Sequence, residues 1–95
     1  MGKGDDILER LIRFGVAVLD LGSDLPKTVA GRHMADQLMR SATAGAPDYA
    51  EARSGESIRD FVHKLGIVRK ELNESSVWLR MLSQAGMGRV NSWMH

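Results

Sequence analysis

A heptad pattern in the C-terminal half of the chain constrains its fold more than any other feature. Between residues 56 and 84, apolar or small residues recur at alternating steps of three and four, which is the spacing of one helix face. They are Ile58, Phe61, Leu65, Val68, Leu72, Ser75, Leu79 and Leu82. A seam sustained over more than three heptads predicts a long helix packed against other helices. Gly86 and Gly88 follow it and are typical helix terminators.

Two further helices are expected before this one. Residues 5–21 carry apolar side chains at helical spacing, and Asp5 and Asp6 suit the positive end of a helix dipole. After a break, a second helix is expected over 27–52, with Thr28 as its N-cap. Its segment 41–47 is rich in small residues, which predicts a close crossing with another helix. Pro47 predicts a kink near 43–47 within one helix.

The fold class that follows is all-α. We expect a single domain over residues 1–95, built as an antiparallel up-down helical bundle of three long helices with a short tail at 86–95. The chain has no cysteine, no apolar run long enough to span a membrane and a polar start without the apolar core of a signal peptide. We therefore expect a cytoplasmic protein without disulfides.

Opposite charges on the second and third helices predict an ion-pair network. Glu71 and Glu74 lie three residues apart on one face, and Arg40 is the matching cation on the preceding helix. We interpret the three residues as a structural network that fixes the register of the helices.

The sequence gives little support for a metal site or a catalytic site. His33 lies near Asp36 and His63 near Asp60, but two isolated pairs do not make a closed ligand set. The serines lack a nucleophile motif, and the glycines form no phosphate loop. We therefore expect no enzyme activity, no metal, no cofactor and no small-molecule substrate.

Two motifs carry a resemblance to a known family. The first is Gln37-Leu38, then Arg40-Ser41-Ala42 and Tyr49-Ala50-Glu51-Ala52. The second runs through Asp60-Phe61, Lys64-Leu65, Ile67, Lys70-Glu71, Glu74-Ser75 and Trp78-Leu79. In order and spacing, the chain resembles the four-helix bundle proteins related to those encoded by ribosomal-RNA intervening sequences. The similarity covers roughly residues 7–86.

The resemblance implies a left-handed up-down bundle and a ring-like homo-oligomer, typically a pentamer. It implies no reaction. Relatives continue past the turn at 86–88 into a fourth helix, whereas this sequence ends at His95. We therefore expect a truncated fourth helix and an apolar groove that a second copy of the chain covers. The candidate oligomer contacts are Trp78, Leu79, Met81, Leu82, Met87 and Trp93.

The functional hypothesis is a self-associating scaffold or adaptor that binds a protein partner. The alternative is an RNA- or DNA-binding accessory protein, as in the distantly similar accessory proteins of retroelements. The candidate nucleic-acid contacts are Arg59, Lys64 and Arg69. The formal net charge of +1 does not favour nucleic acid by itself, but repetition around a ring would concentrate basic residues.

Overall fold

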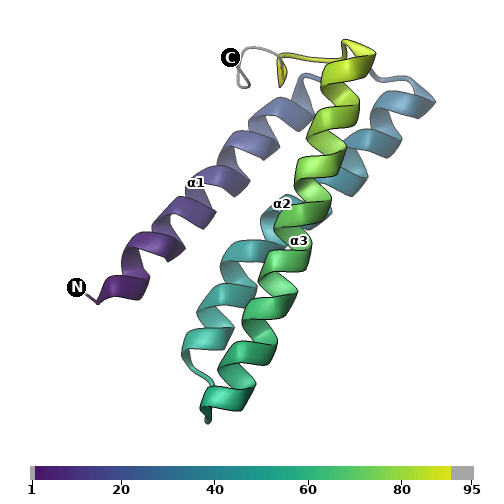
Figure 1. Ribbon diagram of the computed structural model, residues 1–95. Coiled ribbons are helices and arrows are strands. Elements are labelled where there is room, and N and C mark those ends of the chain that lie inside the picture. Colours follow the sequence, from purple (N-terminus) through teal and green to yellow (C-terminus); the bar gives the residue numbers. More distant parts are fainter. Residues whose placement is uncertain (1, 91–95) are drawn as a thin grey trace.

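The structure is a computed structural model that describes residues 2–90, and three helices account for most of them (Figure 1). They are α1 (Lys3–Ser23), α2 (Val29–Arg53) and α3 (Ile58–Ala85). The described residues contain no strand, so the prediction of an all-α chain with three long helices is confirmed. None of these helices is both long and apolar enough to cross a bilayer.

Short polar residues fix the ends of the helices. Thr28 caps α2, as predicted, because its hydroxyl accepts a hydrogen bond from the backbone N–H of Gly31 at 3.1 Å. Ser57 caps α3 in the same way through the N–H of Asp60. Gly86 ends α3 with a φ of 67°, and the N–H of Met87 reaches back to the carbonyl of Leu82. This left-handed ending favours glycine because glycine has no Cβ.

Pro47 lies inside α2, which continues through it as one helix. The sequence predicted one helix at this point, and the structure confirms it. The proline ring is exposed, so the hydrogen bond that proline removes from the ladder lies away from the core. The kink at 43–47 stays a prediction.

The second helix is the centre of the arrangement. α2 packs against both α1 and α3, whereas the backbones of α1 and α3 lie farther apart (Figure 1). The described chain is elongated, with extents of 44 × 23 × 19 Å and a radius of gyration of 14.5 Å. A compact domain of this length would have a radius of gyration of about 12 Å. An unusually large share of each helix therefore faces solvent. This packing is bundle-like, whereas the truncated fourth helix and its completion by a second copy stay predictions.

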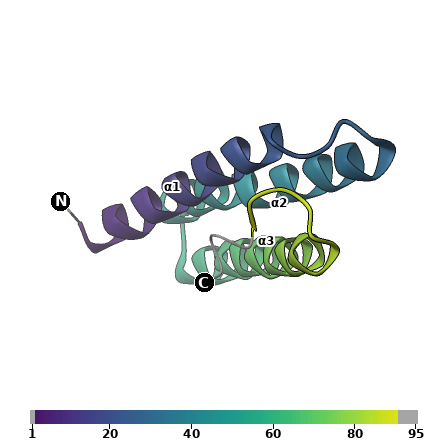
Figure 2. The same cartoon turned by 90° about the horizontal axis from the view of Figure 1, so that it is seen from above.

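The core consists of two apolar clusters. The larger one lies at the end where α1 and α3 finish, and contains Val18, Leu21, Leu25, Leu38, Ala42, Leu82 and Val90. The smaller one contains Leu11, Tyr49 and Val68. Val90 is fully buried, because the segment after α3 turns back toward α1 (Figure 2). Arg89 holds this segment through ion pairs with Asp20 and Asp24 at 2.9 and 3.0 Å.

The heptad seam of α3 faces the core over most of its length. Val68, Ser75 and Leu82 are buried, and Leu65 and Leu72 are partly buried against the smaller cluster. Ile58 is an exception, because its side chain is 83% exposed. Ile58 is the first residue of α3 and therefore lies at the end of the seam.

Candidate interaction surfaces

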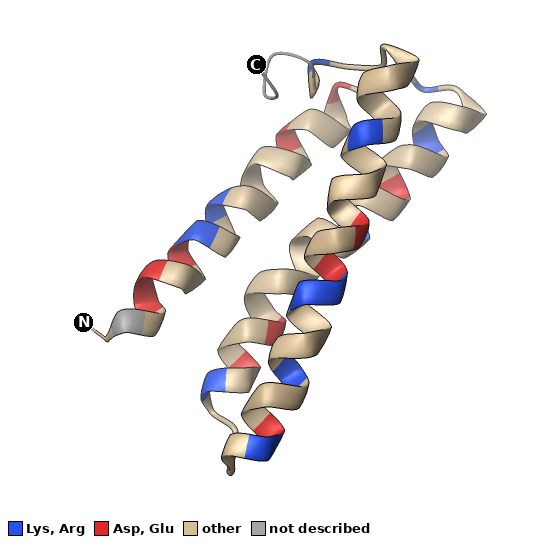
Figure 3. Cartoon of the chain, in the orientation of Figure 1, with Lys and Arg blue, Asp and Glu red and all other residues tan. Residues whose placement is uncertain are grey.

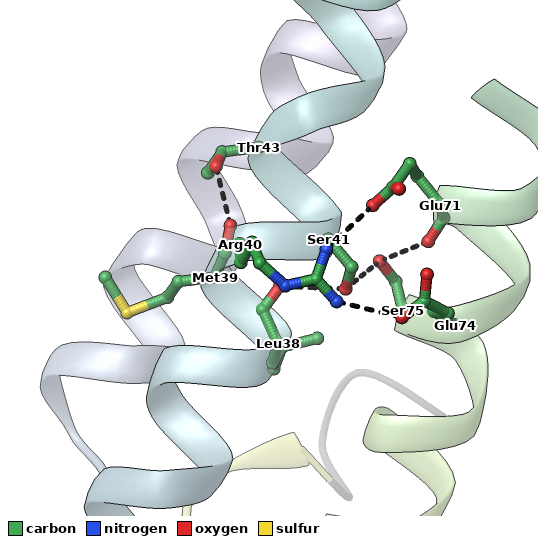
Figure 4. A network of polar contacts seen from close by, with 8 residues as sticks. All are labelled: Leu38, Met39, Arg40, Ser41, Thr43, Glu71, Glu74 and Ser75. Atoms are coloured by element: carbon green, nitrogen blue, oxygen red, sulfur yellow. Dashed lines mark hydrogen bonds and ion pairs between the residues drawn. The ribbon is translucent and has the colours of Figure 1, made fainter. Parts of the chain in front are cut away.

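A polar layer joins α2 and α3 at their crossing (Figure 4). Ser41 and Ser75 are fully buried, and their hydroxyl oxygens lie 2.9 Å apart. Ser75 also donates to the carbonyl of Glu71, and Ser41 lies within hydrogen-bond distance of the carbonyl of Leu38. Because each hydroxyl has one proton, one serine donates to the other while its partner donates to its own helix. Small, satisfied side chains thus let the two helices approach closely.

Arg40 forms ion pairs across the same crossing. Its guanidinium lies 3.4 Å from a carboxylate oxygen of Glu71 and 2.8 Å from one of Glu74. The side chain of Glu71 is only 11% exposed, whereas that of Arg40 is 52% exposed. The structure therefore brings together the three residues that the sequence analysis singled out. Arg40 reaches inward from solvent to cover a nearly buried carboxylate, which ties the register of α2 to that of α3.

This layer offers no catalytic group. The serine hydroxyls are inaccessible and hydrogen-bonded, so neither is available as a nucleophile. Among the described residues, no three potential metal ligands come together. His33 is exposed and lies edge-to-face with Trp78, with ring centroids 6.3 Å apart, and His63 is exposed on α3. The indole N–H of Trp78 is buried without a hydrogen-bond partner among the described residues.

Arg53 and Lys64 form further ion pairs between neighbouring helices. Arg53 at the end of α2 lies 2.7 Å from Asp5 at the start of α1, and this contact lowers the pKa of the Asp5 carboxyl. Lys64 lies 3.0 Å from Glu51 and 3.9 Å from Asp60. The hydrogen bond to Glu51 raises the pKa of the Lys64 ammonium.

The candidate nucleic-acid contacts divide into two kinds. Arg59 and Arg69 are exposed and form no ion pair with another described residue. Lys64 is half-buried and pairs with Glu51 of α2 and Asp60 of α3, so its charge is locally offset. Lys70 is also exposed and forms no ion pair with another described residue, although it was not among the predicted contacts. Lys70 lies opposite the heptad seam, and this position in the sequence pattern already indicates a solvent-exposed cation.

The candidate oligomer contacts lie mostly in the core of the chain itself. Leu82 is fully buried, so the prediction that it contacts another subunit was wrong. Trp78, Leu79 and Met87 are partly buried against the larger cluster. Met81 is 48% exposed, and Trp93 lies outside the described residues. The physical reason is that the segment after α3 folds back and uses the apolar side chains near the end of α3 within the chain.

A row of exposed apolar side chains that borders a groove lies instead on α1. Ile12, Val16 and Leu19 follow one another at helical spacing and are 41%, 60% and 45% exposed. They border a shallow groove of about 180 Å³ between α1 and α2, here called the α1 groove, whose full lining is Leu11, Ile12, Gly15, Val16, Leu19, Thr43 and Ala46. Gly15 makes the groove shallow, because α1 passes close to the backbone of α2 there.

These features define a class: a helical bundle with a structural polar layer at its central crossing and an uncovered apolar face. The profile of the 23S rRNA-intervening sequence protein family matches residues 5–93, so the chain belongs to that family. The family resemblance of the sequence is thereby confirmed.

One solved structure shows how far the similarity extends. It is a crystal structure of a protein of unknown function from the S23 ribosomal protein family of Bacteroides thetaiotaomicron. It superposes with a TM-score of 0.77 at 30% sequence identity, over 83% of this chain and 73% of that chain. No curated protein sequence matches the chain.

Proposed function

We propose that the protein is a non-catalytic helical bundle that associates with further copies of itself and serves as a scaffold or adaptor. The observation that carries the proposal is the α1 groove. Three large apolar side chains in a row border an apolar groove between two helices. A small, elongated domain that leaves such a face in water gains stability when the face is covered.

A second copy of the chain is the occupant that the charges favour. The formal net charge of the chain is only +1, so two copies experience little overall repulsion. Charges of both signs flank the apolar row, with Glu9 and Arg13 before Val16 and Asp20 after it. A partner with the same mixture of signs can place opposite charges against them.

The absence of a catalytic role rests on the chemistry of the described residues. The hydroxyls at the crossing are buried and satisfied, and no three potential metal ligands come together among the described residues. The solved relative from the same family carries no assigned function. A scaffold needs an interaction surface rather than reactive groups, and the α1 groove supports the proposal as such a surface.

The test is the mass in solution of the chain and of one disrupted variant. We expect the wild-type protein to sediment as a multiple of 10.5 kDa. Val16→Glu places a charge in the centre of the apolar row and should give a monomer, because an unpaired charge at an apolar contact is strongly unfavourable.

The matched control is Ile58→Glu. It introduces the same side chain at another exposed apolar position, at the start of α3 and outside the α1 groove. This variant should keep the wild-type mass. A wild-type protein that is monomeric at hundreds of micromolar, or equal masses for both variants, would contradict the proposal.

A further inference from the structure

The charged residues of α3 divide into those that form ion pairs and those that do not. All three carboxylates, Asp60, Glu71 and Glu74, lie on the flank that meets α2, where Lys64 and Arg40 pair with them. Four cations lie elsewhere on the helix: Arg59, Arg69, Lys70 and Arg80. Each of the four is exposed and forms no ion pair with another described residue. We call these four residues the α3 basic face (Figure 3).

Helical spacing places the α3 basic face opposite the core. Steps of eleven residues relate Arg59 to Lys70 and Arg69 to Arg80, and each step returns the helix to within about 20° of the same side. The two pairs together cover an arc of about 100° around α3. From Arg59 to Arg80 the face extends for about 31 Å at 1.5 Å per residue, close to one turn of a nucleic-acid duplex. Between its cations lie Val62, His63, Asn73 and Val77, all exposed and none of them acidic.

A shallow groove lies in the middle of this face. It has a volume of about 420 Å³ and is lined by Gly66, Arg69, Lys70, Asn73, Glu74, Val77 and Trp78. Glu74 is the one carboxylate among them, and Arg40 already offsets its charge. Gly66 leaves the helix backbone open, since a side chain added there would meet no atom within 4 Å. A ligand backbone can therefore come close to α3 between its cations.

We propose that the α3 basic face binds the phosphate backbone of nucleic acid. The core of a protein interface is depleted of charged residues other than Arg, whereas this face has four exposed cations, including Lys70, without an ion-pair partner among the described residues. Backbone contacts to nucleic acid need exposed, unpaired Lys and Arg side chains distributed along the axis of the ligand. The proposal is independent of self-association, because the α1 groove lies on α1 and α2.

The proposal predicts how steeply the binding affinity falls with salt concentration. If each of the four cations of one subunit meets one phosphate, the logarithm of the affinity for duplex DNA should fall with the logarithm of salt at a slope of about −3.6. Affinity should then fall about 150-fold between roughly 50 and 200 mM salt. The probes are labelled DNA and RNA duplexes of one sequence, about two helical turns long. Binding is measured by fluorescence anisotropy.

A pair of charge-matched variants locates the site. Arg69→Gln/Lys70→Gln removes two cations from the α3 basic face and should reduce the slope to about −1.8. Lys27→Gln/Arg32→Gln removes two exposed cations at the start of α2 and should leave the slope unchanged. Equal changes in both variants would show that only net charge matters and would overturn the proposal.

Gly66 supplies a second test that does not endanger the fold. Gly66→Glu places a negative charge between the cations and should weaken binding about tenfold or more. Gly66→Gln has the same size without the charge and should bind like the wild type. Both residues favour a helix more than glycine does, so both variants should fold. Equal binding by the two variants, no binding to either duplex at low salt, or tighter binding to poly-glutamate would overturn the proposal.

Discussion

At the scale of single residues, the crossing of α2 and α3 combines small size with full hydrogen bonding. Ser41 and Ser75 occupy core positions where larger side chains would separate the helices. Each hydroxyl has partners, so neither position carries the cost of an unsatisfied polar group. Arg40 covers Glu71 at the edge of this layer, so a polar contact joins the two helices beside their apolar packing, and we expect it to contribute to their register.

Replacing Arg40 tests this dependence. Arg40→Ala would leave Glu71 nearly buried without its cation, so we expect a loss of about 1–2 kcal/mol, below the value for a fully buried pair because Arg40 itself is half exposed. Arg10→Ala is the control, since Arg10 is exposed and pairs with no described residue. Chemical denaturation monitored by circular dichroism measures both. Equal losses would mean that the network adds nothing to stability.

At the scale of helices and turns, glycines have opposite roles in α2 and α3. Gly31 is buried in the first turn of α2, where an added Cβ would collide with the carbonyl oxygen of Pro26. The turn between α1 and α2 therefore packs directly on the backbone of α2. Gly66 on α3 faces open space instead. Helix propensity alone does not distinguish these positions, because it depends on residue type and not on neighbours.

The two glycines should respond to alanine with opposite signs. Gly66→Ala should stabilise the protein by about 0.5–1 kcal/mol, the usual difference between the two residues inside a helix. Gly31→Ala should destabilise it by about 1–3 kcal/mol, because the backbone must move to admit the methyl group. Thermal melts of the two variants measure both changes in stability. A stabilised Gly31→Ala variant would show that the turn can relax without cost.

The contact between the ends of α1 and α2 should depend on pH. Arg53 lowers the pKa of Asp5 below the ordinary value of 3.8. A depressed folded pKa means that the ion pair contributes stability above pH 3.8, and that the contribution is lost as pH falls through the folded pKa.

Asp5→Asn should therefore melt at a lower temperature than the wild type at neutral pH and at the same temperature in strong acid. Asp6→Asn is the control on the same turn, because Asp6 is exposed and pairs with no described residue. A difference between Asp5→Asn and wild type that persists at all pH values would exclude the ion pair as its cause.

At the scale of the whole molecule, the segment after α3 closes one end of the helical array. Val90 inserts among Val18, Leu21 and Leu82, and Arg89 fastens the segment to α1. The sequence predicted that apolar residues near this end face another subunit. The structure uses them within the chain and leaves the α1 groove exposed.

Val90 should thus behave as a core residue. Val90→Ala removes two methyl groups from a fully buried site and should cost about 2 kcal/mol. Met81→Ala is the control, because Met81 is close to the same end but 48% exposed, and it should change stability by less than about 0.5 kcal/mol. Denaturant titration measures both, with sedimentation confirming that the mass is unchanged. A negligible cost for Val90→Ala would show that the segment does not close the core.

The sequence by itself determined the helices and most of what they bury. The heptad seam of α3, Thr28 as a cap and glycine at residue 86 are local signals, and each acts through spacing or backbone geometry within one helix. The partnership of Arg40 with Glu71 and Glu74 could also be predicted, because one cation and two carboxylates lie at matching positions on neighbouring helices. The family motifs indicated the same helices in the same order as the apolar periodicity did.

Tertiary structure alone decided which apolar residues remain uncovered. Leu82 and Val16 are both apolar residues of amphipathic helices, yet one is fully buried and the other is 60% exposed. The difference depends on the path of the chain after Gly86 and on how closely α1 approaches α2 at Gly15. Tertiary structure likewise decides that Lys64 pairs with carboxylates whereas Lys70 is exposed to solvent. Burial and pairing depend on residues distant in the chain, and local patterns do not contain that information.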